Sequence, residues 1–445
     1  MNIIIPDEVK YIIDTIESNG YDAYAVGGCI RDSLRGETPK DWDVCTSALP
    51  EEIKECFAGK KIIETGLQHG TLTLVLNKAP YEITTYRTDG KYTDYRRPDK
   101  VKFVGVLKRD LARRDFTINA LAYNPKTGLV DYYGGQQDLS NGVIKCVGNP
   151  NKRFQEDALR IMRALRFASE LGFKIDEDTA KAMHDSRGLL NKIAAERIAA
   201  ELNKMLIGRG VSKLLADHVS IITEIIPELI PTIGFNQNSP YHFYDVYTHM
   251  LKSVESAPQD AAIRLTLLLH DIGKPSCYTE DDRGGHFYKH QQVGSEMAGQ
   301  ILRRLKYDNN TVGTVKQLVL YHDAEIHADN KSIKRWLNRI GEERFRKLIQ
   351  VKNADSMAQV YERGEEKRQI LNRVSLMLND IIEQQLCFSL RDMAVDGRDL
   401  IDIGIPESKQ IGVILNQLMN MVIDDEVDNE KENLLKEAEK LMKKV

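Results

Sequence analysis

Two aspartates separated by a single residue, Asp41 and Asp43, are the first side chains along the chain whose spacing could do chemistry. On a β-strand, residues i and i+2 point to the same side, with Cα atoms about 7 Å apart. Carboxylates placed in this way suit shared coordination of Mg²⁺, a hard cation that prefers carboxylate and phosphate oxygens. An acidic turn at the surface would give the same pattern, so the pair alone leaves both interpretations open.

A glycine pair and an arginine precede these aspartates and favour the metal interpretation. Gly27 and Gly28 follow a predicted strand over residues 21–26, and Arg31 lies three residues further on. Glycine at a strand end lets the backbone approach a triphosphate closely, and the guanidinium supplies positive charge. Glycines before an acidic strand pair therefore fit phosphoryl transfer better than a structural turn.

A carboxylate and a guanidinium further along the chain could select a base. Asp157 and Arg160 lie at i and i+3 in a segment with helical spacing from 153 to about 207, which predicts one shared helix face. Asp accepts from an exocyclic amino group and Arg donates to a ring nitrogen, a pattern that cytosine and adenine match and that uracil and guanine reverse. An ordinary helix salt bridge is the alternative. Arg163 and Arg166 continue the series, and helix rotation places Arg163 nearer this face than Arg166.

A third group combines histidines with aspartates. His249 precedes the pair His270 and Asp271, and His286, His290 and His322 follow. Imidazole and carboxylate together suit a divalent transition metal or Mn²⁺, which can activate water against a phosphoester, although a His-Asp pair in a core is the alternative.

Composition limits where a nucleic acid could bind. The 445 residues include 62 basic and 66 acidic side chains, a formal net charge of −4, so a polyanion needs a local patch. Residues 91–115 provide one, with nine basic and four acidic side chains. Six scattered cysteines without a C-x-x-C pair, and no long apolar run, predict a cytoplasmic protein with reduced thiols and no membrane span.

The elements that must position these groups change character along the chain. A helix is predicted over 9–18, and strands over 21–26, 71–76 and 81–86, whereas most of the chain after residue 153 has helical spacing. Length alone predicts about three domains. The expected class is α+β, a mixed α/β first third followed by helices.

Seven short motifs in the first 200 residues, taken together, resemble those of one family. They are Val26-Gly27-Gly28-x-x-Arg31-Asp32 with Asp41-x-Asp43, Thr65-Gly66-x-x-His69-Gly70-Thr71, Tyr81–Arg87, Arg113–Ala120, Asp131-x-x-Gly134-Gly135-x-x-Asp138-Leu139, Glu156-Asp157-x-x-Arg160-x-x-Arg163-x-x-Arg166-Phe167 and Glu196-Arg197-Ile198. In this order they resemble the class II tRNA nucleotidyltransferases, which include CCA-adding enzymes and bacterial poly(A) polymerases. The resemblance implies a DNA polymerase β-like head.

The resemblance also implies a function. It is template-independent addition of the 3′-terminal CCA of tRNA from CTP and ATP, with Mg²⁺ on the catalytic residues Asp41 and Asp43. Glu82 is a candidate third carboxylate. The residues implied to bind nucleotide are Gly28, Arg31, Arg114, Asp157, Arg160, Arg163 and Arg166. Open alternatives are an A-adding enzyme or poly(A) polymerase, and an RNA-binding protein with an inactive head. No obligate protein partner is expected.

The run Leu267–Pro275 resembles the HD metal-dependent phosphohydrolases. That resemblance implies a second metal, Mn²⁺ or Ni²⁺, on His249, His270, Asp271 and a distant aspartate, for which Asp355 is preferred to Asp323. Phosphohydrolysis at RNA ends is therefore an alternative main activity. The expected domains are a head over 1–145, a helical neck over 146–230, an HD domain over 231–360 and a tRNA-binding tail over 361–445.

Overall fold

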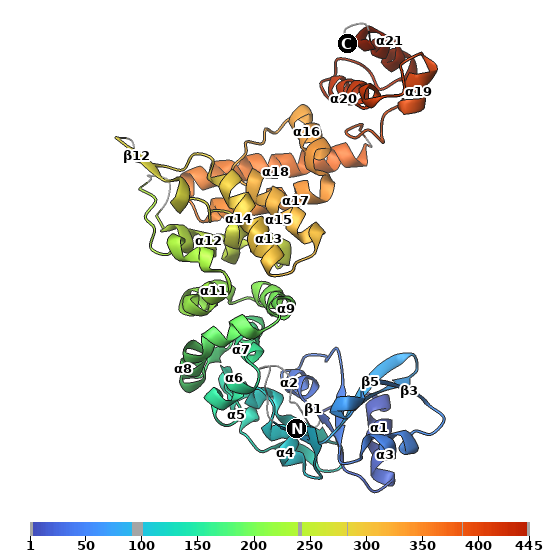
Figure 1. The fold of residues 1–445 in the computed structure, drawn as a ribbon, viewed down its shortest axis with the longest axis vertical. Helices are drawn as coiled ribbons and strands as arrows, with labels where there is room; N and C mark the ends of the chain where they lie inside the picture. The colour runs from blue at the N-terminus through green and yellow to red at the C-terminus, as the bar shows by residue number, and fades with distance from the viewer. Residues whose placement is uncertain (1–2, 91–100, 239–242, 283, 385, 443–445) are drawn as a thin grey trace. The chain divides into compact units, whose positions relative to one another are not determined.

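The protein divides into two compact units. The computed structural model describes residues 3–90, 101–238, 243–282, 284–384 and 386–442. Clustering of the backbone gives one unit from Met1 to Pro227 and another from Glu228 to Val445, and Figure 1 draws both. We describe each unit by itself.

The first unit is built on a mixed seven-stranded sheet with the order β3-β4-β5-β2-β1-β8-β9. The strands are β1 Ala23–Val26, β2 Asp43–Thr46, β3 Lys61–Gly66, β4 Thr71–Leu76, β5 Ala79–Thr85, β8 Leu121–Asn124 and β9 Gly128–Asp131. β2 and β5 run parallel, whereas β1 is antiparallel to both β2 and β8. Outside this sheet, two short pairs form between β6 Arg87–Asp89 and β7 Val101–Phe103, and between β10 Val143–Ile144 and β11 Lys174–Ile175.

Helices cover the sheet and then continue the first unit. They are α1 Asp7–Ser18, α2 Gly28–Leu34, α3 Pro50–Cys56, α4 Leu107–Ala112, α5 Gly135–Asn141, α6 Pro150–Glu156, α7 Leu159–Leu171, α8 Glu177–Ser186, α9 Ala195–Leu206, α10 Val211–Asp217 and α11 Val219–Ile225. In α1, apolar residues spaced three and four apart are all buried, and they join a core with side chains of the sheet. That burial fixes the sheet against α1.

The second unit is almost entirely helical in its described part. Its helices are α12 Val246–Ser256, α13 Ala261–Leu269, α14 His290–Arg304, α15 Asn309–Tyr321, α16 Asn330–Ile340, α17 Glu342–Met357, α18 Tyr361–Glu383, α19 Gly397–Asp402, α20 Lys409–Ile423 and α21 Lys431–Met442. A small hairpin of β12 Thr279–Asp281 and β13 Gly284–His286 interrupts them. The helices α19, α20 and α21 share a hydrophobic core of their own, which includes Leu400, Leu418 and Leu434.

The fold class expected from the sequence is confirmed, because a mixed sheet with helices precedes a helical body. The strand predicted over 71–76 is β4, and the turn after it contains Asn77 and Lys78 with positive φ angles of 49° and 68°. The division into two units does not separate the predicted head from the predicted neck.

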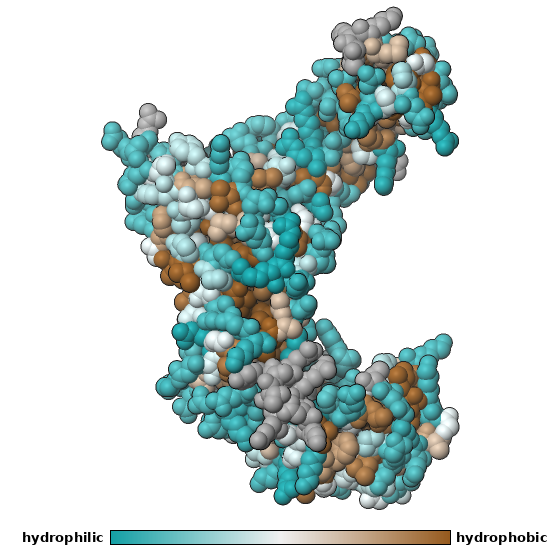
Figure 2. Space-filling model, viewed as in Figure 1, coloured by the Kyte–Doolittle hydropathy of each residue, from teal (hydrophilic) through white to brown (hydrophobic). Residues whose placement is uncertain are grey.

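Hydrophilic side chains cover most of the surface that Figure 2 shows, with small hydrophobic areas between them. The helices of the described residues include none that is both long and apolar enough to cross a membrane.

Candidate nucleotidyl-transfer site and histidine–aspartate cluster

The two aspartates of the first motif lie at the start of β2. The strand begins at Asp43, so Asp41 lies in the preceding loop, and the prediction that both share a strand is wrong. Asp43 is in register with Glu82 on the parallel neighbour β5. Although part of Asp43 is exposed, enclosure by the protein raises its pKa, Glu82 and Asp41 add to that effect, and Arg114 opposes it. A bound cation stabilises the ionised form of a carboxyl of this kind.

The glycine pair forms the turn between β1 and α2. Gly27 has a φ of +88°, in the region that favours glycine, and Gly28 is the first residue of α2. A Cβ on Gly27 would lie 2.9 Å from Nη1 of Arg114, so a larger residue would displace this guanidinium. The turn therefore keeps Arg114 against the backbone beside the carboxylates.

A chain of hydrogen bonds links Arg31 to α7. Nη1 of Arg31 donates to Oδ1 of Asn119 at 2.7 Å, and Nδ2 of Asn119 donates to Oδ1 of Asp115 at 3.1 Å. Nη2 of Arg163 donates to Oδ2 of Asp115 at 2.6 Å. Burial would raise the pKa of Asp115, but Arg163 and Asn119 hold it well below its usual range. A charged Asp115 thus connects two of the predicted nucleotide-binding arginines.

Three arginines also surround the ring of Phe167 on α7. The guanidinium carbons of Arg31, Arg163 and Arg166 lie 5.1, 5.3 and 3.9 Å from its centroid. These distances are in the range of cation–π attraction. The aromatic ring therefore gathers positive charge where α2 and α7 come together.

Asp157 and Arg160 do not share a helix face, so that prediction is wrong. Asp157 is an extended residue at the end of α6, and α7 begins only at Leu159. Oδ2 of Asp157 lies 3.5 Å from Nη2 of Arg197, and its Oδ1 accepts from the backbone N–H of Leu159. Burial raises the pKa of Asp157, while Arg197 and Arg160 lower it in part.

Arg160 has partners of its own. Its Nη1 donates to Oε2 of Glu156 at 3.0 Å and to the carbonyl of Arg153, and its Nη2 donates to the carbonyl of Arg113 at 2.9 Å. The simple helix salt bridge between Asp157 and Arg160 is therefore not what forms here. The two side chains are held separately, on either side of the α6–α7 junction.

Arg166 points toward the helical part of the unit. Its Nε donates to Glu201 on α9 at 2.6 Å, and its Nη1 donates to Glu170 at 2.8 Å. Both ion pairs are short, and Arg166 is only 8% exposed. Arg163 instead pairs with Asp115, so the two arginines have different partners.

Sequence reasoning gave no role to three residues that the structure places in this site. Asp115 and Asn119 connect Arg31 to Arg163, and Arg197 faces Asp157. Each belongs to a quoted motif, but its partner lies far along the chain, so spacing gave no signal. Of the basic segment over 91–115, residues 91–100 lie outside the described residues.

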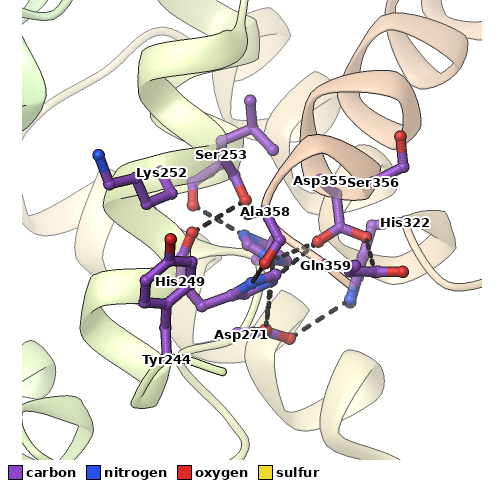
Figure 3. Close-up of polar contacts among 12 residues, drawn as sticks. Tyr244, His249, Lys252, Ser253, Asp271, His322, Asp355, Ser356, Ala358 and Gln359 are labelled. Carbon is purple, nitrogen blue, oxygen red and sulfur yellow. Dashed lines mark hydrogen bonds and ion pairs between the residues drawn. The ribbon is translucent and has the colours of Figure 1, made fainter. Parts of the chain in front are cut away.

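Six buried side chains form what we call the histidine–aspartate cluster in the second unit. They are His249, His270, Asp271, His290, His322 and Asp355. Figure 3 labels His249, Asp271, His322 and Asp355 among them. His249 lies on α12 and Asp355 on α17, whereas the other four lie at the ends of α13, α14 and α15. Helix ends from distant parts of the chain therefore meet at one point.

Asp271 belongs to two overlapping groups of ligand-type side chains. One contains His249 and His270 and the other contains His290 and His322, and within each group the ligand atoms lie within 4.8 Å of one another. Oδ1 of Asp355 lies 2.8 Å from Nε2 of His249 and 3.4 Å from Nε2 of His270. The structure thus brings together the four predicted ligands, and adds two histidines to them.

Hydrogen bonds orient the four imidazoles. Nδ1 faces a backbone carbonyl in each case, at 2.8 Å in His270, 2.7 Å in both His290 and His322, and 3.3 Å in His249. A carbonyl only accepts, so Nδ1 carries a proton and Nε2 is the ring nitrogen that faces the cluster. The Nε2 atoms of His249 and His270 are 3.3 Å apart, close enough for one divalent cation to bind both.

The carboxyl of Asp271 supports the same conclusion. Nζ of Lys274 lies 2.7 Å from Oδ2, yet neither buried oxygen accepts a well-aligned hydrogen bond from any residue that the structure describes. Burial would raise the pKa of Asp271, but His270 and Lys274 hold it well below its usual range. An unsatisfied buried carboxylate among imidazole Nε2 atoms fits a divalent metal.

The remaining candidates lie outside the cluster. His286 pairs with Asp281 on the small hairpin at 2.9 Å, and Asp323 is exposed beside His322. Gly273 allows the cluster to form, because a Cβ there would lie 2.4 Å from the carbonyl oxygen of His290. Any larger residue would push the start of α14 away from Asp271.

Comparisons with known proteins define the class first. Residues 23–145 match the family model described as poly A polymerase head domain, and residues 172–231 match a probable RNA- and SrmB-binding site of polymerase A. Residues 287–438 match a putative domain 2 of tRNA nucleotidyltransferases. The fold and the head site therefore define a nucleotidyltransferase.

Relatives then give the family. The chain is 34% identical to a CCA-adding enzyme of Pediococcus pentosaceus over 98% of both chains, and 33% identical to one of Enterococcus faecalis over 98% and 97%. The Bacillus stearothermophilus CCA-adding enzyme, solved in complex with CTP, matches with a TM-score of 0.74 and 28% identity over 99% of each chain. A Thermotoga maritima CCA-adding enzyme complexed with tRNA shares the fold, with a TM-score of 0.62 at 20% identity. The chain belongs to the CCA-adding enzyme family.

Proposed function

We propose that this protein adds and repairs the 3′-terminal CCA of tRNA, using CTP and ATP without a nucleic-acid template. The observation that carries the proposal is the constellation on the inner strands of the sheet, where Asp43 stands beside Glu82 and the Gly27 turn holds Arg114. Family membership over 98% of the chain supports it. The tRNA 3′-hydroxyl attacks the α-phosphate, and pyrophosphate leaves.

In this proposal, Asp41 and Asp43 hold Mg²⁺ through their carboxylate oxygens. The ion, when bound, lowers the pKa of the attacking hydroxyl and neutralises charge on the triphosphate. Arg114 lies beside Asp43 and is placed to donate to phosphate oxygens. Arg163 is oriented by Asp115, and Arg31 by Asp32 and Asn119, so both guanidinium groups keep fixed directions.

Base selection remains assigned to Asp157 and Arg160, although they do not pair as the sequence suggested. Each is anchored by its own partners, Arg197 for Asp157 and Glu156 for Arg160. They therefore form no ion pair with each other, although Arg160 lowers the pKa of Asp157 in part. Such a pair can contact the amino group and ring nitrogen that cytosine and adenine share.

The test is to incubate the protein with tRNA that ends at the discriminator base, with CTP and ATP singly and together. A CCA-adding enzyme extends by CC with CTP alone and by CCA with both. An A-adding enzyme or poly(A) polymerase fails on this substrate with CTP, and an RNA-binding protein with an inactive head extends nothing.

A second candidate function rests on the histidine–aspartate cluster. We propose that it binds Mn²⁺ or Ni²⁺ and hydrolyses a phosphate ester at an RNA end or on a nucleotide. The unsatisfied carboxyl of Asp271 and the four inward Nε2 atoms favour it. Incubation of the metal-loaded protein with 2′,3′-cyclic phosphates and 2′-nucleotides tests it, because a purely structural cluster cleaves neither.

We propose four domains. They are a catalytic head over 1–145, a base-selecting neck over 146–230, a metal-binding body over 231–360 and a tRNA-binding tail over 361–445.

A further inference from the structure

A cavity of about 340 Å³ opens beside the histidine–aspartate cluster. His322 and Asp355 form part of its wall, so the cavity reaches the cluster itself. The other lining residues come from the turn after α15, from α17 and from α18: Asp323, Ala324, Glu325, Ile326, His327, Lys352, Lys367, Ile370 and Leu371. All of them belong to the second unit.

Two lysines line this cavity in different ways. Nζ of Lys352 donates to the carbonyl oxygens of His322 and Ala324, at 2.7 and 2.8 Å. Those bonds hold the turn that carries His322. Lys352 is therefore a positioning residue, and its ammonium is largely committed to the backbone.

Lys367 is tied to the cluster through one intermediate. Nζ of Lys367 donates to Oε1 of Gln359 at 2.9 Å, and Nε2 of Gln359 donates to Oδ2 of Asp355 at 2.8 Å (Figure 3 shows the second bond). An ammonium has three N–H donors, and this bond to Gln359 takes one of them. The chain of bonds thus fixes a cation on the cavity wall, one side chain away from a proposed metal ligand.

The charges of the wall make anion binding conditional on a metal. Asp323, Glu325 and Asp355 contribute three carboxylates, against the two ammonium groups of Lys352 and Lys367. One negative charge is in excess, which disfavours a phosphate. A single divalent cation on the cluster reverses that balance, because it adds two positive charges.

One side of the cavity is apolar. Ile326 is 6% exposed and Leu371 4% exposed, and Ile370 lies beside Leu371 on α18. A wall of this kind suits the face of a base or a ribose, whereas the charged side suits a phosphate. The volume is near the lower end for ligand sites, which limits the ligand to about one nucleotide.

We propose that this cavity binds the phosphate group of a single nucleotide, either free or at the end of an RNA, and that Lys367 is its phosphate-binding side chain. The inference rests on the proposed phosphohydrolase function and specifies its substrate class. The phosphate lies between the ammonium of Lys367 and a metal held by the histidine–aspartate cluster.

The experiment measures phosphate binding and metal content together. It uses the full chain in an Asp43→Asn background, so that phosphate bound at the head contributes little, with inorganic phosphate as the probe in titration calorimetry. The protein that keeps Lys367 and is loaded with Mn²⁺ should bind phosphate, and the same protein after treatment with a chelator should not. Lys367→Gln should weaken binding by about tenfold or more without loss of Mn²⁺. Lys331→Gln is the control, because Lys331 lines a different cavity and pairs with Asp424.

Further arms distinguish the sources of the phosphate. A nucleoside 3′-monophosphate and a tRNA with a 3′-terminal phosphate should both lose affinity in Lys367→Gln, and the better ligand identifies the natural form. Equal phosphate affinity in Lys367→Gln and wild type overturns the role of Lys367. Phosphate binding that survives chelation overturns the requirement for the metal. Absence of Mn²⁺ from the wild-type protein, seen by elemental analysis, overturns the metal centre and this inference with it.

Discussion

The two sites assigned to metals differ in how much of the coordination the protein itself supplies. In the head, Asp41 and Asp43 are exposed, and Arg114 lies close enough to Asp43 to oppose the rise in its pKa. In the histidine–aspartate cluster, six buried side chains meet, and hydrogen bonds to carbonyls orient all four imidazoles. The first arrangement leaves room for oxygens of a substrate, and the second resembles a resident metal site.

The difference has a thermodynamic consequence. A metal at the head needs the triphosphate to complete its shell, so nucleotide and Mg²⁺ are expected to bind together. A metal in the cluster finds its ligands already placed, so it should remain through dialysis. The following substitutions test this contrast, in order of the effect expected.

The largest effect is expected for Asp43→Asn. Replacing the charged carboxylate by an amide removes a metal ligand but keeps the side-chain shape, so nucleotide addition should fall by about 10³-fold or more. Steady-state incorporation of CMP and AMP into tRNA measures it, with tRNA affinity as the control. Incorporation close to the wild-type rate would remove Asp43 from the metal site.

The converse substitution is Asp271→Asn in the cluster. It should abolish stoichiometric Mn²⁺ or Ni²⁺ binding, because Asp271 is shared by both groups of ligands. Nucleotide addition should stay within about twofold of wild type, since this residue lies in the other unit. Elemental analysis after dialysis and the addition assay are the two measurements. A parallel loss of addition would show that the sites are not independent.

A smaller effect is expected on base selection. Asp157→Ala removes the acceptor for the amino group that C and A share, and a hydrogen bond to a charged group is worth about 1.5–3 kcal/mol. Discrimination against UTP, measured as the ratio of kcat/KM values, should therefore fall by about 10- to 100-fold. Arg197→Lys is the matched variant, because it keeps the charge beside Asp157. An Asp157→Ala enzyme that rejects UTP as strongly as wild type would assign base selection elsewhere.

Asp115→Asn should lower the free energy of unfolding by about 2 kcal/mol at neutral pH, since Asp115 accepts charge-assisted bonds from Arg163. The pKa of Asp115 is depressed in the folded state, so its contribution exists above the unfolded value of about 4 and is lost as the pH falls through the folded value. Urea unfolding at several pH values should show a constant difference from pH 8 to about pH 5, and a narrowing one below about pH 4. A difference that grows on acidification would contradict this.

The smallest effect on catalysis is expected for Arg166→Lys. Arg166 is paired with Glu170 and Glu201, so the substitution should reduce thermal stability and leave the KM for CTP nearly unchanged. Arg163→Lys should instead raise the KM for CTP, because it removes the guanidinium that Asp115 orients. A large rise in KM for Arg166→Lys would return this residue to the nucleotide site.

Much of the architecture follows from local patterns. Alternating and helical spacing predicted β4 and the helical body, because burial of one face imposes a period that the sequence displays. The same reasoning failed at Asp157 and Asp41, where a helix end and a strand start fall one or two residues from the expected place. Those boundaries depend on caps and packing rather than on periodicity.

The histidine–aspartate cluster shows the other limit of sequence reasoning. His270 and Asp271 are adjacent, so their pairing was visible, and Asp355 followed from resemblance. The orientation of His249 depends on the distant carbonyl of Ala358, whereas the other three imidazoles use carbonyls three residues before them. Contacts between residues 109 positions apart leave no trace in spacing.

The position of His270 and His322 just beyond α13 and α15 has a consequence for how this body could change over time. Each imidazole donates to a carbonyl in the last turn of its helix, those of Leu267 and Val319, which would otherwise lack a partner inside the helix. An asparagine or a serine at the same place can donate to the same carbonyl. One substitution at either position can therefore remove a proposed metal ligand and keep the helix cap, so the fold can persist without the metal site.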